Sequence, residues 1–133
     1  MNYALDASAL VAYLNGEPGA SVVAGLLPDP NNLCYAHAIN LCEVFYGTLR
    51  AANERAARAA ITTLYTDGVI MRRDMSERFW KRVGRLKATG KISIPDCFRI
   101  VLAQRVGGEV VTSEHREFNP LGPLAIAPIL FIR

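Results

Sequence analysis

The sequence predicts an α/β fold in which a mainly parallel sheet is covered by helices. Short apolar segments with strand character alternate along the chain with longer segments of helical periodicity, and strands that are joined through helices run parallel. The 133 residues, 51% of them hydrophobic and 20% charged, have the size and composition of one compact domain. No internal repeat or low-complexity linker divides the sequence. We therefore expect a single domain over residues 1–133.

Each predicted element rests on a local pattern. The predicted strands are short apolar segments, at residues 3–5, 33–36, 69–71, 109–112 and 126–132. The predicted helices carry apolar residues at helical spacing, at residues 8–14, 19–27, 40–52, 54–67, 75–89 and 95–106. Turn-forming residues separate these elements: Asn15 and Gly16 end the first helix, Gly68 precedes the third strand, and Gly107 and Gly108 precede the fourth.

The segment 75–89 has a clear amphipathic pattern. Met75, Phe79, Val83 and Leu86 recur at helical spacing, as one face of a helix requires. We expect these four side chains to face the core.

Four acidic residues follow the predicted strands. Asp6 comes directly after the first strand, Glu43 lies in the helix after the second, Asp96 opens the last helix, and Glu114 follows the strand that ends at Thr112. Because sites in such sheets form at the carboxyl ends of the strands, we expect these carboxylates at one edge. Carboxylates about 4 Å apart repel by roughly 4 kcal/mol per pair at an effective dielectric constant near 20. Protons or a cation must neutralise them.

A hard divalent cation such as Mg²⁺ or Mn²⁺ suits a site built from oxygen ligands, and it pairs naturally with phosphate. The chemistry that fits is phosphodiester hydrolysis by water that the metal activates. Asp6 and Asp96 are the expected principal ligands, and Ser8 and Thr112 are placed to hydrogen-bond a ligand carboxylate or a bound water. Glu43 is expected to complete the cluster or to orient the attacking water.

Helix capping is a competing explanation for two of these acids. Asn40 to Glu43 and Ser93 to Asp96 both place an acid three residues after a small polar residue, as in a capping box. Asp6 fits a purely structural role less well, because an acid at the end of an apolar strand costs burial energy unless a partner compensates it.

Four short segments carry these acids in a fixed order: Leu5–Leu10 (LDASAL), Asn40–Val44 (NLCEV), Ile94–Cys97 (IPDC), and Val111–Glu114 (VTSE) with Phe118 after it. Together they resemble the successive acidic motifs of PIN domains. The length of the chain most resembles VapC, the toxin half of toxin–antitoxin pairs. The resemblance spans nearly the whole chain, and the joint match of the motifs carries its specificity.

This resemblance implies a three-layer α/β/α fold and a Mg²⁺- or Mn²⁺-dependent endoribonuclease. It also implies a homodimer that a small VapB-like antitoxin protein inhibits. Asp6, Glu43 and Asp96 take the three best-matched acidic positions. The fourth position departs from the family pattern, in which Asp or Asn commonly stands. This chain has Glu114 there, and Glu117 is an alternative for the later acid.

A basic face is expected on the helix 75–89, opposite its apolar residues. Arg78, Lys81, Arg82 and Arg85 share this face at helical spacing. Twelve of the fifteen Lys and Arg residues in the chain are arginine, which favours bidentate phosphate contacts. We expect Arg78, Arg82 and Arg85 to bind the RNA backbone without reading its sequence. A solvated helix face is the alternative.

The cysteines and the lengths of the apolar segments indicate the cellular compartment of the protein. Cys34, Cys42 and Cys97 are odd in number, lie in apolar segments and lack C-x-x-C spacing, so we expect buried thiols rather than disulfides or a zinc site. A reduced, cytoplasmic protein is the simplest inference. We expect neither a secretory signal nor a membrane span, because no basic n-region with an apolar stretch and no run of about 18 apolar residues occurs.

Two other functions stay open. An aspartyl-phosphate enzyme with Asp6 as nucleophile is disfavoured, because position 8 is serine and the D-x-D spacing fails. A non-catalytic RNA-binding or scaffolding module has no evident reason to gather four uncompensated acids. Setting those acids aside turns the formal charge of +3 into fifteen cations against eight anions. The sequence thus predicts an acidic site in a basic body.

Overall fold

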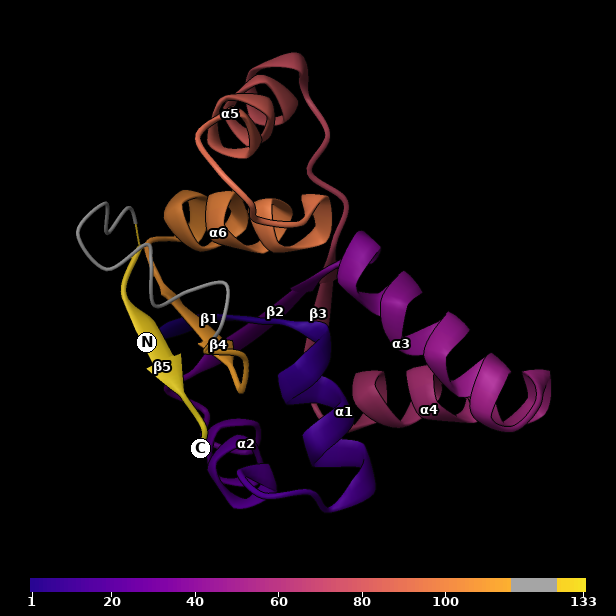
Figure 1. The fold of residues 1–133 in the computed structure, drawn as a ribbon. Helices are drawn as coiled ribbons and strands as arrows, with labels where there is room; N and C mark the ends of the chain where they lie inside the picture. Colours follow the sequence, from indigo (N-terminus) through magenta and orange to yellow (C-terminus); the bar gives the residue numbers. More distant parts are fainter. Residues whose placement is uncertain (116–126) are drawn as a thin grey trace.

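The computed structural model describes residues 1–115 and 127–133, and its strands form one five-stranded sheet (Figure 1). The strands are β1 (Asn2–Leu5), β2 (Leu33–His37), β3 (Val69–Arg72), β4 (Glu109–Thr112) and β5 (Ile129–Phe131). Their order across the sheet is β3-β2-β1-β4-β5, and every pairing is parallel. The predicted α/β class is confirmed. The last strand is shorter than predicted, and Ile126 lies outside the described residues.

The helices follow the predicted ranges closely. They are α1 (Ala7–Asn15), α2 (Ala20–Leu26), α3 (Ala38–Ala51), α4 (Glu54–Thr66), α5 (Glu77–Ala88) and α6 (Ile94–Val106). The prediction for α5 was wrong at its start, because Ser76 caps this helix by accepting a hydrogen bond from the Phe79 N–H at 3.3 Å. Met75 therefore precedes the helix and is 54% exposed, whereas Phe79, Val83 and Leu86 are buried as predicted.

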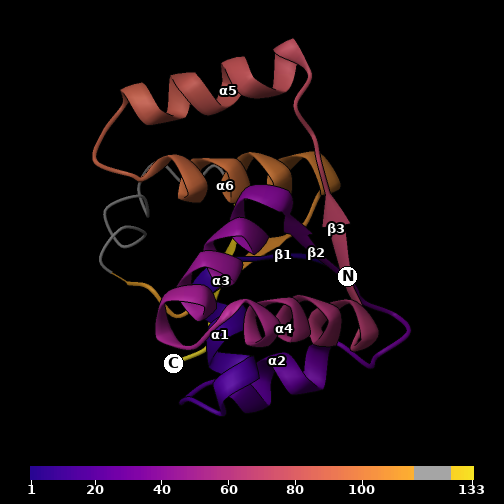
Figure 2. The same cartoon turned by 90° about the vertical axis from the view of Figure 1, so that its right-hand side faces the viewer.

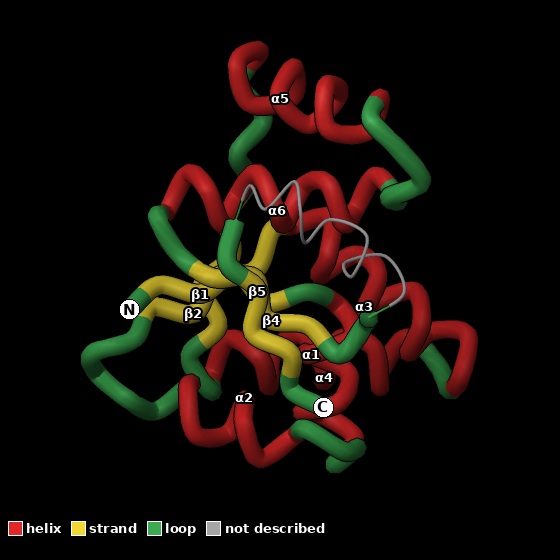
Figure 3. The backbone as a smooth tube through the Cα atoms, turned by 60° about the vertical axis from the view of Figure 1, so that its left-hand side comes forward, coloured by secondary structure: helices red, strands yellow, loops and turns green. Residues whose placement is uncertain are grey.

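The helices cover both faces of the sheet and complete the three layers of an α/β/α sandwich (Figures 1 and 3). On one face, Phe79 of α5 and Val101 of α6 belong to a core that includes Val110 of β4. Figure 2 shows α5 lying over α6, on the side away from α1, α2 and α4. On the opposite face, Leu10 of α1 and Leu64 of α4 belong to a second core. The helix α3 contacts α1, α4 and α6, so it joins the two faces.

Glycine fixes the connection that leads into β4. Gly107 ends α6 with φ +65°, in the left-handed region that glycine adopts without strain. Gly108 is required by a close approach, because a Cβ there would lie 2.2 Å from the carbonyl oxygen of Asn2. The start of β4 is thereby held directly beside β1.

The register between β1 and β4 positions the candidate site. Leu5 pairs with Val111, and the backbone N–H of Asp6 donates to the Val111 carbonyl at 3.1 Å. Because the two strands are parallel, Asp6 and Thr112 emerge at the same carboxyl edge of the sheet.

Asp74, in the loop between β3 and α5, links four segments of the chain. Its carboxylate accepts two hydrogen bonds from Arg72, from Nε at 2.8 Å and Nη2 at 2.9 Å, and it pairs with Arg105 Nε at 3.0 Å. Its carbonyl oxygen lies 2.9 Å from Nε2 of His37. The Arg72 hydrogen bonds outweigh partial burial and hold the pKa of the Asp74 carboxyl below its usual range, with Coulombic help from Arg72 and Arg105.

Asp74→Asn is expected to lower the free energy of unfolding by about 1 to 3 kcal/mol at neutral pH, because it removes a charged acceptor from this junction. A folded-state pKa below the unfolded value means that the carboxylate contributes stability above its unfolded pKa. That contribution is lost as the pH falls through the lowered folded pKa. Urea unfolding of both proteins between pH 7 and pH 3 should therefore show a difference in the free energy of unfolding that narrows toward pH 3. A difference that stays constant with pH would contradict this role.

Candidate active site

The four acids singled out in the sequence line one cavity of about 330 Å³ at the carboxyl edge of the sheet. Asp6 follows β1, Glu43 lies on α3, Asp96 lies in the first turn of α6, and Glu114 follows β4. The rest of the lining is Ala7, Ser8, Ser93 and Arg99. The structure thus brings the four carboxyl groups to the edge at which they were expected.

Asp6 is held by four donors and is 1% exposed. It caps α1, since Oδ1 accepts hydrogen bonds from the Ala9 N–H at 2.7 Å and from Ser8 Oγ at 2.6 Å. Its Oδ2 accepts from Thr112 Oγ1 and lies 3.2 Å from Nη2 of Arg99. Ser8 and Thr112 therefore both contact the carboxylate that the sequence assigns as a principal ligand.

The capping explanation is confirmed for Ser93, but it involves only the backbone N–H of Asp96 and not its carboxylate. Ser93 is the N-cap of α6, and its Oγ accepts a hydrogen bond from the Asp96 N–H at 3.3 Å. The Asp96 carboxylate instead forms an ion pair with Nη2 of Arg99, and the residue is 7% exposed. Capping and a role in the cavity are thus compatible at this position.

The capping explanation for Asn40 is wrong, because α3 begins before it. The N-cap is His37, whose Nδ1 accepts a hydrogen bond from the Ile39 N–H at 3.1 Å. Asn40 is fully buried, and its Oδ1 accepts a hydrogen bond from Nη1 of Arg99 at 3.3 Å. Asn40 therefore supports the site from behind through Arg99, which lines the cavity, and Glu43 follows Asn40 by one helical turn.

Glu43 carries a buried oxygen that nothing in the described structure satisfies. Its Oε1 has no hydrogen-bond partner among the described residues. Burial raises the pKa of the Glu43 carboxyl, the charge of Arg99 acts in the opposite direction, and the charge of Asp6 raises the pKa further. An acceptor of this kind beside a cavity is suited to a water molecule or a cation.

The prediction from sequence missed Arg99, which is 2% exposed at the centre of the acid cluster. Its Nη2 bridges the carboxylates of Asp6 and Asp96. Burial lowers the pKa of the Arg99 guanidinium to about 10, while the charges of neighbouring acids act in the opposite direction. One signal could have found it: Arg99 follows Asp96 by three residues on one helix face, inside an otherwise apolar run.

The donor set suits a hard divalent cation, since every acid in the cavity offers carboxylate oxygens. The unsatisfied Oε1 of Glu43 also points to a further ligand there. Within residues 1–115 and 127–133, no three His, Cys, Asp or Glu side chains are grouped tightly enough to hold a metal ion. Because Arg99 bridges Asp6 and Asp96, these two carboxylates can share a cation only after the guanidinium shifts.

The fourth acidic position is Glu114, an exposed residue at the rim of the cavity. Its backbone N–H donates to Thr112 Oγ1 at 2.9 Å, which ties it to the end of β4. Glu117 and Phe118 lie outside the described residues. The choice between Glu114 and Glu117 as the fourth acid therefore stays open.

The three arginines expected to bind RNA are exposed on α5 and lie apart from the residues that line the acidic cavity. Arg82 and Arg85 line a separate groove of about 340 Å³ with α6 residues, and Arg82 Nη2 donates to Oε1 of Gln104 at 2.7 Å. Arg78 lies one turn before Arg82 on α5. The basic face is thus real, and its function stays a prediction.

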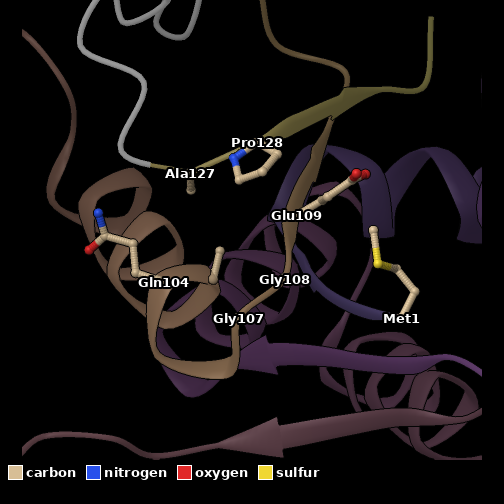
Figure 4. Close-up of a pocket in the computed structure, with 8 residues that line it drawn as sticks. Met1, Gln104, Gly107, Gly108, Glu109, Ala127 and Pro128 are labelled. Atoms are coloured by element: carbon tan, nitrogen blue, oxygen red, sulfur yellow. The ribbon is translucent and has the colours of Figure 1, made fainter.

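A second pocket lies at the opposite, amino edge of the sheet (Figure 4). Its volume is about 180 Å³, and its lining includes Met1, Gly108 and Pro128. Of the residues that line it, Glu109 is the only acid. This pocket lacks the clustered carboxylates of the first.

The cysteines are free thiols, as expected, but their burial differs. Cys34 and Cys97 are buried, whereas Cys42 is exposed on α3, contrary to the prediction. Burial raises the pKa of the Cys34 thiol to about 11.

In the part of the chain that is described, no helix has the length and apolar character needed to cross a membrane.

Comparison with known proteins gives one family match. A family model described as PIN domain matches residues 3–121. No curated protein sequence matches the chain. Among solved structures, the chain is similar to VapBC-1 from nontypeable Haemophilus influenzae, with a TM-score of 0.72 and 20% identity over 99% of this chain and 98% of that one.

Two further structures show the same similarity of fold. VapBC2 from Rickettsia felis, bound to a DNA fragment from its promoter, has a TM-score of 0.73 and 18% identity, with 98% of each chain covered. VapC20 from Mycobacterium tuberculosis, described as a toxin that cleaves the sarcin–ricin loop, has a TM-score of 0.69 and 14% identity over 90% of this chain and 95% of that one.

Proposed function

Because the chain belongs to the PIN domain family, we propose that it is a Mg²⁺- or Mn²⁺-dependent endoribonuclease and the toxin of a toxin–antitoxin pair. The observation that carries the proposal is the convergence of Asp6, Glu43, Asp96 and Glu114 on one cavity from four separate segments of the chain. Such a concentration of carboxylates is costly without a cation. A cation that neutralises it also attracts a phosphodiester.

Five residues of the site have a defined task in this proposal, and Glu114 is the candidate fourth acid. Asp6 and Asp96 would hold the cation, which supplies activation of water and neutralises charge on the phosphoryl oxygens when bound. Ser8 and Thr112 donate hydrogen bonds to the Asp6 carboxylate and fix its orientation. Glu43 offers its unsatisfied Oε1 to orient the attacking water and accept its proton.

The similar structures support RNA as substrate and a small protein as inhibitor. The structures from Haemophilus influenzae and Rickettsia felis carry the name VapBC, and a similar structure from Mycobacterium tuberculosis, VapBC-5, is described as a member of the VapBC family of toxin–antitoxin systems. VapC20 from Mycobacterium tuberculosis is described as a toxin that cleaves the sarcin–ricin loop. We infer by analogy of fold that this chain pairs with a VapB-like antitoxin, forms a homodimer and acts in the cytoplasm.

Incubation of the purified protein with mixed cellular RNA tests the proposal. Discrete cleavage products are expected in Mg²⁺ or Mn²⁺, and none in excess chelator. Electrophoresis and mapping of the new RNA ends would measure both. Equal cleavage in chelator would exclude the metal-dependent mechanism.

A non-catalytic RNA-binding or scaffolding module is the second candidate, and one observation favours it. Arg99 already neutralises two of the acids, as a purely structural ion pair would. The two proposals predict different affinities of the protein for Mn²⁺. A metal-dependent nuclease should bind Mn²⁺, whereas a scaffold should bind it weakly or not at all. Calorimetric titration of the purified protein with Mn²⁺ separates them.

Replacing Arg78, Arg82 and Arg85 together with Ala is expected to weaken RNA binding and flatten its dependence on salt. The slope of log K against log salt is negative, and each lost phosphate contact makes it shallower by about 0.7 for a single strand. Three lost contacts therefore make it shallower by about 2. Fluorescence anisotropy with labelled RNA, in an Asp96→Asn background that prevents cleavage, would measure the slope.

The matched control removes three exposed arginines from α3 and α4, namely Arg50, Arg55 and Arg58. It has the same change in net charge, so only a local contact distinguishes the two triple variants. Equal slopes in the two variants would remove α5 from the RNA-binding surface.

A further inference from the structure

The positive charge of Arg99 balances part of the negative charge of the acids that line the cavity. The residue is 2% exposed, and its Nη2 lies 3.2 Å from Oδ2 of Asp6 while also pairing with Asp96. Its Nη1 donates to the buried Oδ1 of Asn40 at 3.3 Å. A buried guanidinium held by two carboxylates and an amide is a built feature rather than a surface side chain that happens to lie nearby.

The same two carboxylates are the proposed ligands of the divalent cation. A carboxylate oxygen that accepts hydrogen bonds from Arg99 cannot at the same time take a cation at ligand distance from the same direction. Two positive charges within a few ångströms of each other also repel strongly in a buried site. The two cations are therefore alternatives at Asp6 and Asp96.

We infer that Arg99 is an internal counter-cation that competes with the divalent cation for Asp6 and Asp96. This inference rests on the proposed function, because it concerns the same site. Without metal, Arg99 holds the carboxylates together and stabilises the fold. When a divalent cation enters, the guanidinium withdraws from both carboxylates. Arg99 thus acts as a positioning residue that lowers metal affinity and keeps the empty site folded.

The test compares Arg99→Gln and Arg99→Lys with the wild type. Gln removes the charge, whereas Lys keeps it as a point charge that cannot form the same planar bridge. The matched control is Arg105→Gln, which removes the same charge from the other end of α6, where Arg105 pairs with Asp74. Two quantities are measured: the Mn²⁺ dissociation constant from the electron paramagnetic resonance signal of free Mn²⁺, and the melting temperature in chelator and in saturating Mn²⁺.

Arg99→Gln is expected to bind Mn²⁺ about ten-fold more tightly than the wild type, because the competing charge is gone. Its melting temperature in chelator is expected to fall by about 4 °C or more. Saturating Mn²⁺ should then raise the melting temperature of Arg99→Gln by more than it raises that of the wild type. Arg99→Lys should lie between the two proteins in both measurements. Arg105→Gln should change the Mn²⁺ dissociation constant by less than about two-fold.

Unchanged or weaker Mn²⁺ binding in both Arg99 variants would overturn the inference, while Mn²⁺ binding by the wild type would still support the proposed function. Absence of Mn²⁺ binding in all the proteins would overturn both. If Arg99→Gln does not fold in chelator, folding induced by Mn²⁺ would support the inference. A variant that stays unfolded in saturating Mn²⁺ would contradict it.

Discussion

Asp96→Asn is expected to lower the rate of RNA cleavage in Mn²⁺ by more than the roughly 100-fold that changes outside the ligand shell can cost. The substitution keeps the size of the side chain and the backbone N–H that donates to Ser93. It removes the negative charge that pairs with Arg99 and that we assign to the cation. The α6 cap therefore survives, and Arg99 keeps its ion pair with Asp6, so we expect the variant to be less stable but still folded, with the loss of cleavage arising from the missing ligand.

The control for Asp96→Asn is Asp29→Asn, which makes the same change at an exposed turn. Both variants should keep the circular dichroism spectrum of the wild type. Single-turnover cleavage of a labelled RNA should separate them, with Asp29→Asn cleaving at the wild-type rate. Near-normal cleavage by Asp96→Asn would remove this residue from the catalytic site.

Asp6→Ala is expected to lower the free energy of unfolding by about 3 to 5 kcal/mol, the cost of breaking one side of a buried ion pair. The carboxylate accepts from the Ala9 N–H, two hydroxyl groups and Arg99. Removing it leaves the first turn of α1 uncapped and several donors buried without an acceptor.

Urea unfolding of Asp6→Ala in chelator, followed by the fluorescence of Trp80, measures this loss. Asp6→Asn is the informative companion, because an amide oxygen can still accept the Ala9 N–H and cap α1. It should therefore lose less stability than Asp6→Ala. A loss below about 1 kcal/mol in Asp6→Ala would contradict the network described for this carboxylate.

Much of the fold could be predicted from the sequence because local patterns and tertiary packing agree. The helical spacing of apolar residues that predicts α5 is the same pattern that buries Phe79, Val83 and Leu86. The error at Met75 arose because apolar periodicity cannot show where a helix begins. Ser76 decides that boundary by accepting a backbone hydrogen bond.

The convergence of the four acids on the candidate site was predictable, because parallel strands deliver the residues that follow them to one edge. Arg99 was missed because α6 is buried almost all round, so a charged residue inside it has no polar face to mark it. The cap of α3 was misplaced for a related reason. His37 caps the helix through Nδ1, which composition does not distinguish from a metal ligand or a core histidine.

Anomalous scattering from a crystal of the protein soaked in Mn²⁺ tests the central claim most directly, which is that the acidic cavity takes a divalent cation. The account predicts an anomalous peak in contact with the carboxylates of Asp6 and Asp96, with the guanidinium of Arg99 moved away from both. A soaked crystal with no peak in the cavity and with Arg99 still bridging the two carboxylates would contradict it.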